Sequence, residues 1–194
     1  MDGSSCTAPP MRLLGLPGSL RRGSHSRAIL RGLVAELVGR IQLEIREIDL
    51  PLYNQDEDGD AAPHSIREFR RAIAESDGLV IATPEYNHGM PGVLKNALDW
   101  ASRPYGKSAL TDKPVLVISN SPGFVGGARA HVQVNETLHS IPARLLGGQQ
   151  VVIPNVAGKI RDDRLADAAS LRFALAAVDR LATLCRARSP SGAT

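Results

Sequence analysis

Residues 78–100, GLVIATPEYNHGMPGVLKNALDW, hold a strand, a loop and a helix in succession, and they decide the fold class. Gly78–Thr83 is almost wholly apolar, which is typical of a central parallel strand covered by helices on both faces. From Pro91 to Ser102 the apolar residues recur at helical spacing, so we expect a helix there. A buried strand joined by a polar loop to an amphipathic helix indicates the repeating unit of an α/β fold.

The same alternation extends in both directions along the chain. Four more strands are predicted, at Arg12–Pro17, Ile41–Asp49, Pro114–Asn120 and Gln149–Pro154. Four more helices are predicted, at Ser24–Gly39 with a serine cap, and at His64–Glu75, Gly127–Ser140 and Asp163–Arg186. The acidic, turn-rich segment Pro51–Pro63 is predicted to be a solvated connection. This order of elements indicates a doubly wound, five-stranded parallel sheet with helices on both faces.

Length and composition set limits on the class of protein. The chain has 194 residues, 43% of them hydrophobic and 22% charged, which is typical of a soluble globular protein. We expect one domain over residues 11–187, with disordered tails at 1–10 and 188–194. No apolar run approaches the roughly 20 residues of a membrane span, and no secretory signal pattern opens the chain, so we expect no membrane association.

Charge and cysteine content narrow the partners. The formal net charge is +3, the basic residues are scattered, and only 4% of residues are aromatic, so nucleic acid is not expected as a partner. Cys6 and Cys185 show no metal-ligand or redox-motif spacing, and no metal site is predicted. A reducing, cytoplasmic location is expected.

Three unusual loops follow the first, third and fourth predicted strands, whose carboxyl ends share one edge of the sheet. In the first loop, GSLRRGSHS at 18–26, hydroxyls, helix N-terminal amides and the Arg21 and Arg22 side chains could surround a phosphate. The loop lacks the spacing of dinucleotide and nucleoside-triphosphate motifs, which favours a single terminal phosphate. A plain serine-capped helix is the alternative.

The second and third loops suit a flat ring. Tyr86 could lie against such a ring or cover the core, and Asn87 could bond its polar edge. For His88 three interpretations stay open: a proton donor, a structural residue, or an exposed side chain. The glycine-rich loop at 121–127 offers amides to carbonyl oxygens or to negative charge on a ring, and Phe124 could shield it. A phosphate at one end and a flat heteroaromatic ring at the other is the shape of flavin mononucleotide (FMN).

The helix after the second loop carries Trp100 beside Leu94, Ala97 and Leu98 at helical spacing. We expect this apolar face to be buried in a core or a subunit interface. Lys95 and Asp99, four residues apart, are expected to pair.

Four motifs together resemble the NADPH-dependent FMN reductase family, in particular its bacterial quinone and chromate reductase branch. They are GSLRRGSHS at 18–26, PLYNQDED at 51–58, TPEYNHGMPGVLKNALDW at 83–100 and SPGFVGGARA at 121–130, and the similarity spans roughly residues 11–184. The resemblance implies a flavodoxin-like fold with strand order 2-1-3-4-5. It also implies non-covalent FMN at the carboxyl edge of the sheet, and a homodimer or homotetramer with flavin sites near a subunit interface.

The resemblance also assigns roles to individual residues. The phosphate would be held by Ser19, Arg21, Ser24 and Ser26, the ribityl chain and ring by Pro84, Glu85, Tyr86 and Asn87, and the other side of the ring by Ser121 and Gly123. Two positions depart from the family pattern. The family commonly has Asn where Ser26 stands and Ser where Gly89 stands.

The activity implied is an oxidoreductase in which NADPH or NADH gives hydride to FMN, and two electrons then pass to a quinone, chromate, an azo compound or free flavin. No side-chain acid or base is required, because the flavin carries the chemistry. Two other functions are possible for this fold: a flavodoxin-like single-electron carrier, or a non-enzymatic flavin redox sensor. The net positive charge disfavours the carrier, since flavodoxins resemble one another in having acidic docking faces.

Overall fold

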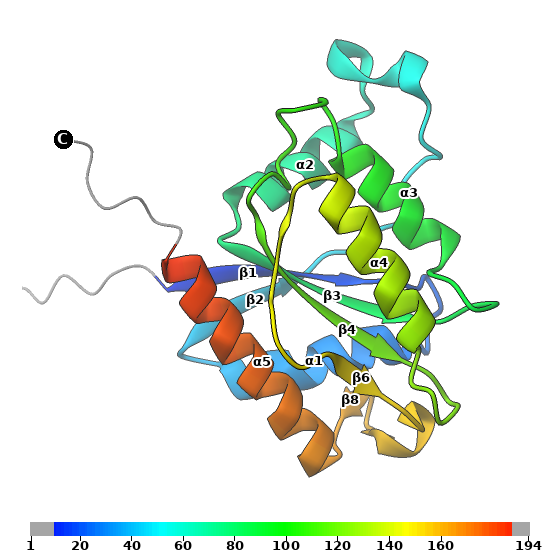
Figure 1. Ribbon diagram of the computed structural model, residues 1–194, viewed down its shortest axis with the longest axis vertical. Helices are drawn as coiled ribbons and strands as arrows, with labels where there is room; N and C mark the ends of the chain where they lie inside the picture. The colour runs from blue at the N-terminus through cyan, green and yellow to red at the C-terminus, as the bar shows by residue number, and fades with distance from the viewer. Residues whose placement is uncertain (1–9, 188–194) are drawn as a thin grey trace, which may run out of the picture.

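The computed structural model describes residues 10–187, apart from the side chain of Asp60. Its main sheet is parallel and has the order β2-β1-β3-β4-β5 (Figure 1). The four leading strands are β1 (Met11–Pro17), β2 (Ile41–Ile45), β3 (Gly78–Pro84) and β4 (Pro114–Asn120). The predicted flavodoxin-like α/β order is therefore confirmed.

Helices cover both faces of this sheet (Figure 1). On one face lie α1 (His25–Leu37) and α5 (Ala168–Arg186), and on the other lie α2 (His64–Glu75), α3 (Gly92–Ala101) and α4 (Ala128–Ser140). Each element sits where its apolar pattern predicts, because the central strands bury both faces and each helix buries one.

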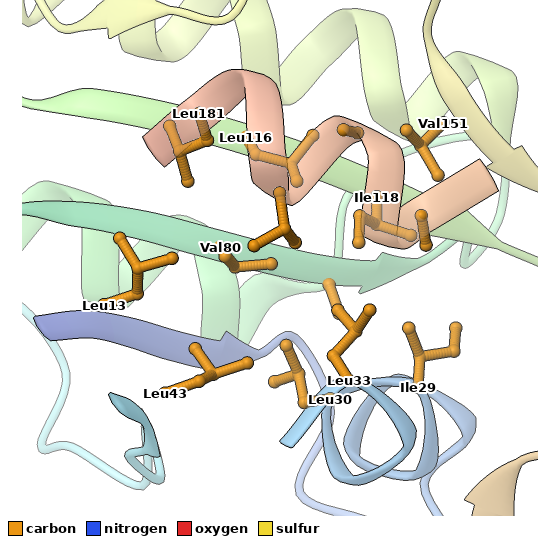
Figure 2. Packing of buried hydrophobic residues seen from close by; sticks show 14 of the residues in the cluster. Leu13, Ile29, Leu30, Leu33, Leu43, Val80, Leu116, Ile118, Val151 and Leu181 are labelled. Atoms are coloured by element: carbon orange, nitrogen blue, oxygen red, sulfur yellow. The ribbon is translucent and has the colours of Figure 1, made fainter. Parts of the chain in front are cut away.

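Alternation along the strands divides the core into two layers. Leu13, Val80 and Leu116 point toward α1 and α5, as Figure 2 shows, where they meet Ile29, Leu30, Leu33 and Leu181. Their neighbours Leu14, Leu79 and Val115 point to the opposite layer, under α3 and α4. Because side chains alternate with a period of two, continuous apolar runs supply both layers at once.

The predicted last strand is the main point where the structure differs. The strand predicted at Gln149–Pro154 is present as the shorter β6 (Val151–Ile153), and a second short strand that was not predicted, β5 (Arg144–Leu145), precedes it. The two pair with opposite ends of β4. Between them the chain leaves the sheet through Gly147 and Gly148, the latter with φ of +95°. A backbone in this left-handed region cannot continue a strand, so the pairing is interrupted.

Two other predicted boundaries are wrong. Strand β2 ends at Ile45 rather than Asp49, because Pro17 on β1 has no N–H to continue the pairing beyond the bond from the Arg46 N–H to the Gly15 carbonyl. Helix α5 begins at Ala168 rather than Asp163. A hairpin of β7 (Ile160–Arg161) and β8 (Arg164–Leu165) precedes it, and the Asp167 carboxylate caps it by accepting from the Ser170 N–H at 2.9 Å.

The acidic segment 51–63 is more ordered than a solvated connection. It contains the 3₁₀ turns η1 (Gln55–Glu57) and η2 (Gly59–Ala61), and it projects beyond α2 and α3 in Figure 1. Asp58 pairs with Arg70 of α2 at 2.7 Å, and both side chains are mostly buried. The Asn96 carboxamide accepts from the Tyr53 N–H at 2.8 Å. The base of the segment is therefore fixed to the helices by polar contacts.

Trp100 lies in the core of its own chain. Its ring is fully buried, its Nε1–H donates to the Pro51 carbonyl at 2.8 Å, and Tyr53 packs edge-on against it. Leu94, Ala97 and Leu98 are likewise buried. The predicted burial of this apolar face is therefore confirmed, and the face lies in the core rather than in a subunit interface. The predicted Lys95–Asp99 pair is confirmed, with Nζ 2.8 Å from Oδ1.

Some predictions fall on the ends of the chain. The tails predicted to be disordered, 1–10 and 188–194, lie outside the described residues except for Pro10, and so does Cys6. Among residues 10–187, no helix is both long and apolar enough to cross a membrane.

Candidate functional site

A small pocket lies where the loops after β1, β3 and β4 meet, at the carboxyl edge of the sheet. Its volume is about 70 Å³, against roughly 30 Å³ for one water molecule in the liquid, so it accepts a group the size of a phosphate. The lining residues are Ser19, Arg21, Ser24, His25, Ser26, Pro84, Glu85, Tyr86, Asn120 and Pro122. Seven of the ten predicted site residues are among them.

Three buried serine hydroxyls form the inner part of this pocket. Ser19, Ser24 and Ser26 are each less than 5% exposed. Ser24 caps α1, as predicted, with its hydroxyl accepting from the Arg27 N–H at 3.3 Å. The first amides of α1 have no carbonyl partner within the helix, and their dipoles favour an anion. Hydroxyls and free amides together suit a phosphate monoester.

Arginines act on this loop in two ways. Arg21 is exposed, and its guanidinium donates to the Gly23 carbonyl at 2.8 Å. Arg27, on the first turn of α1, holds the backbone of the loop. Its guanidinium donates to the Arg21 carbonyl at 3.0 Å and pairs with Glu47 at 2.5 Å. The contact of Arg27 with the first loop was not predicted, because nothing in the sequence distinguishes Arg27 from other polar residues on the exposed side of a helix.

His25 is the first residue of α1 and lines the same pocket. Partial burial, together with the nearby Arg21 charge, lowers the pKa of its imidazole below the ordinary value of 6.5. The free protein therefore favours the neutral ring beside the pocket.

The second loop turns back on itself as a tight hairpin. Tyr86 and Gly89 exchange two backbone hydrogen bonds of 3.0 Å, and Asn87 and His88 between them have positive φ values of 50° and 66°. Two successive residues with positive φ define a type I′ turn, for which asparagine is favoured. The Tyr86 ring is 45% exposed, and its hydroxyl lies 3.0 Å from the Ser19 hydroxyl, which joins the first two loops.

Glu85 ties this hairpin to α4. Its carboxylate accepts from the N–H groups of Arg129 and Ala130, at 3.0 and 3.2 Å. Because the N-cap residue Gly127 has no side chain, Glu85 supplies the cap for that helix. His88 is 75% exposed and contacts both the Arg129 guanidinium and the Glu85 carboxylate. The structure therefore places His88 on the surface, in a charged cluster.

The position of Gly89 explains one departure from the family pattern. The Gln133 carboxamide of α4 accepts from the Met90 N–H at 2.6 Å. A Cβ atom at position 89 would lie 3.0 Å from the same Gln133 oxygen. A serine here would require Gln133 to move, so glycine at 89 and glutamine at 133 suit one another.

The third loop is shaped by its glycines. Gly126 and Gly127 have φ values of +66° and +83°, and a Cβ at Gly127 would lie 2.9 Å from the Asn120 carbonyl oxygen. The Gly123 N–H donates to the Ser121 hydroxyl at 3.1 Å. Phe124 is 85% exposed at the rim. Backbone conformation therefore fixes this loop, while its side chains face solvent.

Asn87, Ser121 and Gly123 were predicted for the site but do not line the pocket. Asn87 is in the turn of the hairpin, and the other two belong to the exposed third loop. Conversely, His25, Asn120 and Pro122 line the pocket and were not predicted. A sequence signal for Asn120 existed, because Ser119 and Asn120 are the polar end of an otherwise apolar strand.

The residues fit the predicted cofactor at both ends. Buried serine hydroxyls, Arg21 and the α1 N-terminus match a phosphate, and the exposed Tyr86 and the third-loop amides match a flat, polar-edged ring. The pocket holds only a phosphate-sized group, so the remainder of FMN would lie on the open edge. Among the described residues, no group of three or more His, Cys, Asp or Glu side chains could hold a metal ion.

Comparison with known proteins supports the same assignment. The sequence model of the NADPH-dependent FMN reductase family matches residues 11–158. A quinone reductase of Pseudomonas putida is 40% identical over 174 residues, covering 86% of this chain and 90% of that protein. An NAD(P)H-dependent FMN reductase of Pseudomonas aeruginosa is 36% identical over 161 residues, covering 79% of this chain and 86% of that protein.

Solved structures agree. FerB, a flavoenzyme NAD(P)H:(acceptor) oxidoreductase from Paracoccus denitrificans, superposes with a TM-score of 0.81 at 32% identity, covering 91% of this chain and 98% of that one. An oxidoreductase from Corynebacterium diphtheriae, with a TM-score of 0.67 at 18% identity, shares the fold and covers 93% of this chain and 99% of that one. The predicted resemblance, cofactor and enzyme class are thereby confirmed, and the chain belongs to the NADPH-dependent FMN reductase family.

Proposed function

We propose that this FMN-dependent NAD(P)H oxidoreductase uses quinones as its electron acceptors. The observation that carries the proposal is the meeting of three loops at one sheet edge, around a phosphate-sized pocket with an exposed aromatic ring beside it. Relatives named quinone reductase support the acceptor class, as does a 2-hydroxy-1,4-benzoquinone reductase of a Burkholderia species, which is 46% identical over 121 residues. Chromate, azo compounds and free flavin are further proposed acceptors.

In this proposal residues 11–187 form one FMN-binding domain, and the predicted residues keep their assigned parts. Ser19, Arg21, Ser24 and Ser26 hold the phosphate. Pro84, Glu85, Tyr86 and Asn87 hold the ribityl chain and ring, and Ser121 and Gly123 bound the other side of the ring. The bound flavin supplies the hydride and electron-transfer chemistry. Glu85 contributes indirectly: its carboxylate accepts from two N–H groups at the start of α4 and so fixes the hairpin that carries Tyr86 and Asn87.

The protein's own contribution is position and electrostatics. The buried hydroxyls and α1 amides fix one end of the cofactor, and the open edge leaves room for a flat substrate. Amides of the 121–127 loop other than those of Ser121, Gly123 and Gly126, which already donate within the protein, would stabilise negative charge on the reduced ring. Because Tyr86 and Phe124 leave the ring end open to solvent, we expect a broad choice of acceptors rather than a narrow one.

We further propose a homodimer or homotetramer in the cytoplasm. The family resemblance supports this assembly, and the buried apolar face of α3 takes no part in it. Size-exclusion chromatography with light scattering will measure the molar mass of the protein and so test the assembly. A monomer at micromolar concentration would contradict it. The cytoplasmic location follows from two cysteines with no pairing pattern.

The decisive experiment is a visible spectrum of the purified protein with FMN supplied, followed under anaerobic conditions by NADPH and then a quinone. We expect NADPH to bleach the flavin bands and quinone to restore them. Bound flavin that NADPH does not bleach would indicate an electron carrier or redox sensor instead. We also propose that NAD(P)H and the acceptor bind in turn over one face of the flavin, which gives parallel lines in double-reciprocal kinetics; intersecting lines would contradict this.

A further inference from the structure

Ser26 and Asn120 form a buried polar contact at the base of the phosphate-sized pocket. Ser26 is 1% exposed and Asn120 is fully buried, although one lies on α1 and the other at the end of β4. The Asn120 amide nitrogen lies 2.9 Å from the Ser26 hydroxyl oxygen and 3.0 Å from the Thr83 carbonyl oxygen. This contact joins α1 to the carboxyl ends of the two central strands.

The Thr83 carbonyl fixes which way the Asn120 side chain faces. A carbonyl oxygen can only accept a hydrogen bond, so the Asn120 nitrogen must be the atom beside it. The second hydrogen of that nitrogen then goes to Ser26, whose hydroxyl is the acceptor. As a result the Ser26 proton is left to donate elsewhere, and it is directed away from Asn120.

Two unused groups therefore lie next to each other. The Ser26 proton has no acceptor among the hydrogen bonds of residues 10–187, and the fully buried Asn120 Oδ1 has no donor there. Buried polar atoms in folded proteins are nearly always paired, and an unpaired one is costly. Both residues line the pocket. The pair thus suits a ligand that brings an acceptor and a donor together.

The Ser26 proton and the Asn120 Oδ1 atom suit different parts of a flavin, because one is a donor and the other an acceptor. An ionised phosphate only accepts, so it can use the Ser26 proton but has nothing to give to Asn120 Oδ1. A hydroxyl can donate to that oxygen. FMN carries both features side by side, because its phosphate is attached to a ribityl chain that bears hydroxyls.

We propose that Asn120 is a further cofactor-binding residue, whose Oδ1 accepts from a ribityl hydroxyl and whose amide nitrogen directs the Ser26 hydroxyl toward the phosphate. The inference rests on the proposed FMN site and adds to it a residue from β4. It also assigns Ser26 an oriented proton, which a serine in an unsupported loop would lack.

Binding of three flavins to Asn120→Leu tests this directly, with fluorescence quenching as the readout. FMN has the phosphate and ribityl chain, riboflavin has only the ribityl chain, and lumiflavin has neither. We expect riboflavin affinity to fall about fivefold, FMN affinity to fall about fiftyfold, and lumiflavin affinity to stay within twofold, because a charge-assisted bond is stronger than a neutral one.

Two more variants separate the halves of the proposal. Ser26→Ala should weaken FMN about tenfold or more and leave riboflavin within twofold, since only the phosphate contact is lost. Asn120→Asp keeps an oxygen acceptor but gives up the amide donor to Ser26 and places a carboxylate near the phosphate, so riboflavin should bind as before while FMN weakens through both changes. This variant also keeps the size of the side chain, and it serves if Asn120→Leu does not fold.

The opposite results are equally clear. Unchanged FMN and riboflavin affinities in Asn120→Leu would overturn the inference, and so would an FMN loss with riboflavin unaffected, which removes the ribityl contact. An equal loss for lumiflavin would make Asn120 a purely structural residue. If the wild-type protein bound none of the three flavins, the proposed function itself would fail, and this inference with it.

Discussion

The two ends of the candidate site are built by different means. At the phosphate end, three serine side chains are buried and hydrogen bonded, and a helix N-terminus lies among them. At the ring end, Tyr86 and Phe124 are 45% and 85% exposed, and the backbone of the hairpin and of the glycine loop provides the shape. One end is suited to hold a cofactor in place, and the other leaves it accessible to substrates.

The largest change in stability is expected from a substitution that disturbs the backbone conformation at the ring end. Gly127→Ala should lower the free energy of unfolding by roughly 3 kcal/mol, because its φ is +83° and the new Cβ would lie 2.9 Å from a backbone oxygen. Urea denaturation will measure it. Gly123→Ala is the matched control in the same loop, where the nearest atom is 3.6 Å away, and it should change stability by less than about 0.5 kcal/mol. Equal stabilities of the two variants would mean that backbone conformation does not build this end.

A smaller effect on stability should distinguish the phosphate end. Ser24→Ala removes the cap of α1 and should cost about 1 kcal/mol of stability, and it should also weaken FMN binding. Asp167→Ala removes the matching cap of α5, away from the pocket, and should cost a similar amount. Titration calorimetry with FMN will distinguish the two variants, because only Ser24→Ala should weaken FMN binding. If both variants bind FMN as the wild type does, Ser24 serves the helix alone.

Whether a feature of the two ends could be predicted from the sequence depends on how far apart in the chain the interacting residues lie. The strands and helices followed from apolar periodicity, because a residue's burial is decided by its spacing along its own element. Ser24 was predicted as a cap for the same reason, since the cap and the helix it serves are adjacent in the chain.

Interactions between distant residues could not be predicted in this way. Glu85 caps α4 from 44 residues away, and Asn120 reaches Ser26 across 94 residues, so no local pattern carries either contact. The type I′ turn at Asn87 and His88 also lacked its usual asparagine–glycine signal, because histidine occupies the second position. Strand β5 was not predicted, because only Arg144 and Leu145 pair with β4 there and two residues are too few to show an apolar pattern.

Because Arg21 is exposed, we expect its removal to have only a modest effect on FMN affinity. Its guanidinium is solvated, so Arg21→Ala should weaken FMN binding about fivefold, less than a buried arginine would. Arg22→Ala is the control, since that side chain is exposed and does not line the pocket. Isothermal titration at low and high salt will measure both. An effect of Arg22 as large as that of Arg21 would indicate general attraction of an anion rather than a contact.

The smallest effect is a change of proton affinity at the phosphate end. Burial and the Arg21 charge hold the pKa of His25 below 6.5 in the free protein, and a bound phosphate beside it would oppose both causes. FMN should therefore raise the pKa of His25, whereas riboflavin, which lacks the phosphate, should not. Ring proton shifts followed by NMR against pH will measure the pKa of His25 with each flavin.

The sign of this effect links it to binding. A base whose pKa rises on binding takes up a proton, so its contribution to FMN affinity grows as the pH falls through the pKa of the bound state. The contribution becomes constant below the pKa of the free state, where His25 is already protonated without ligand. Replacing His25 by Gln removes this contribution and leaves only the titration of the phosphate itself. If riboflavin raised the pKa of His25 as much as FMN does, the phosphate would not lie at the α1 N-terminus, and the division of the site into a holding end and an open end would fail.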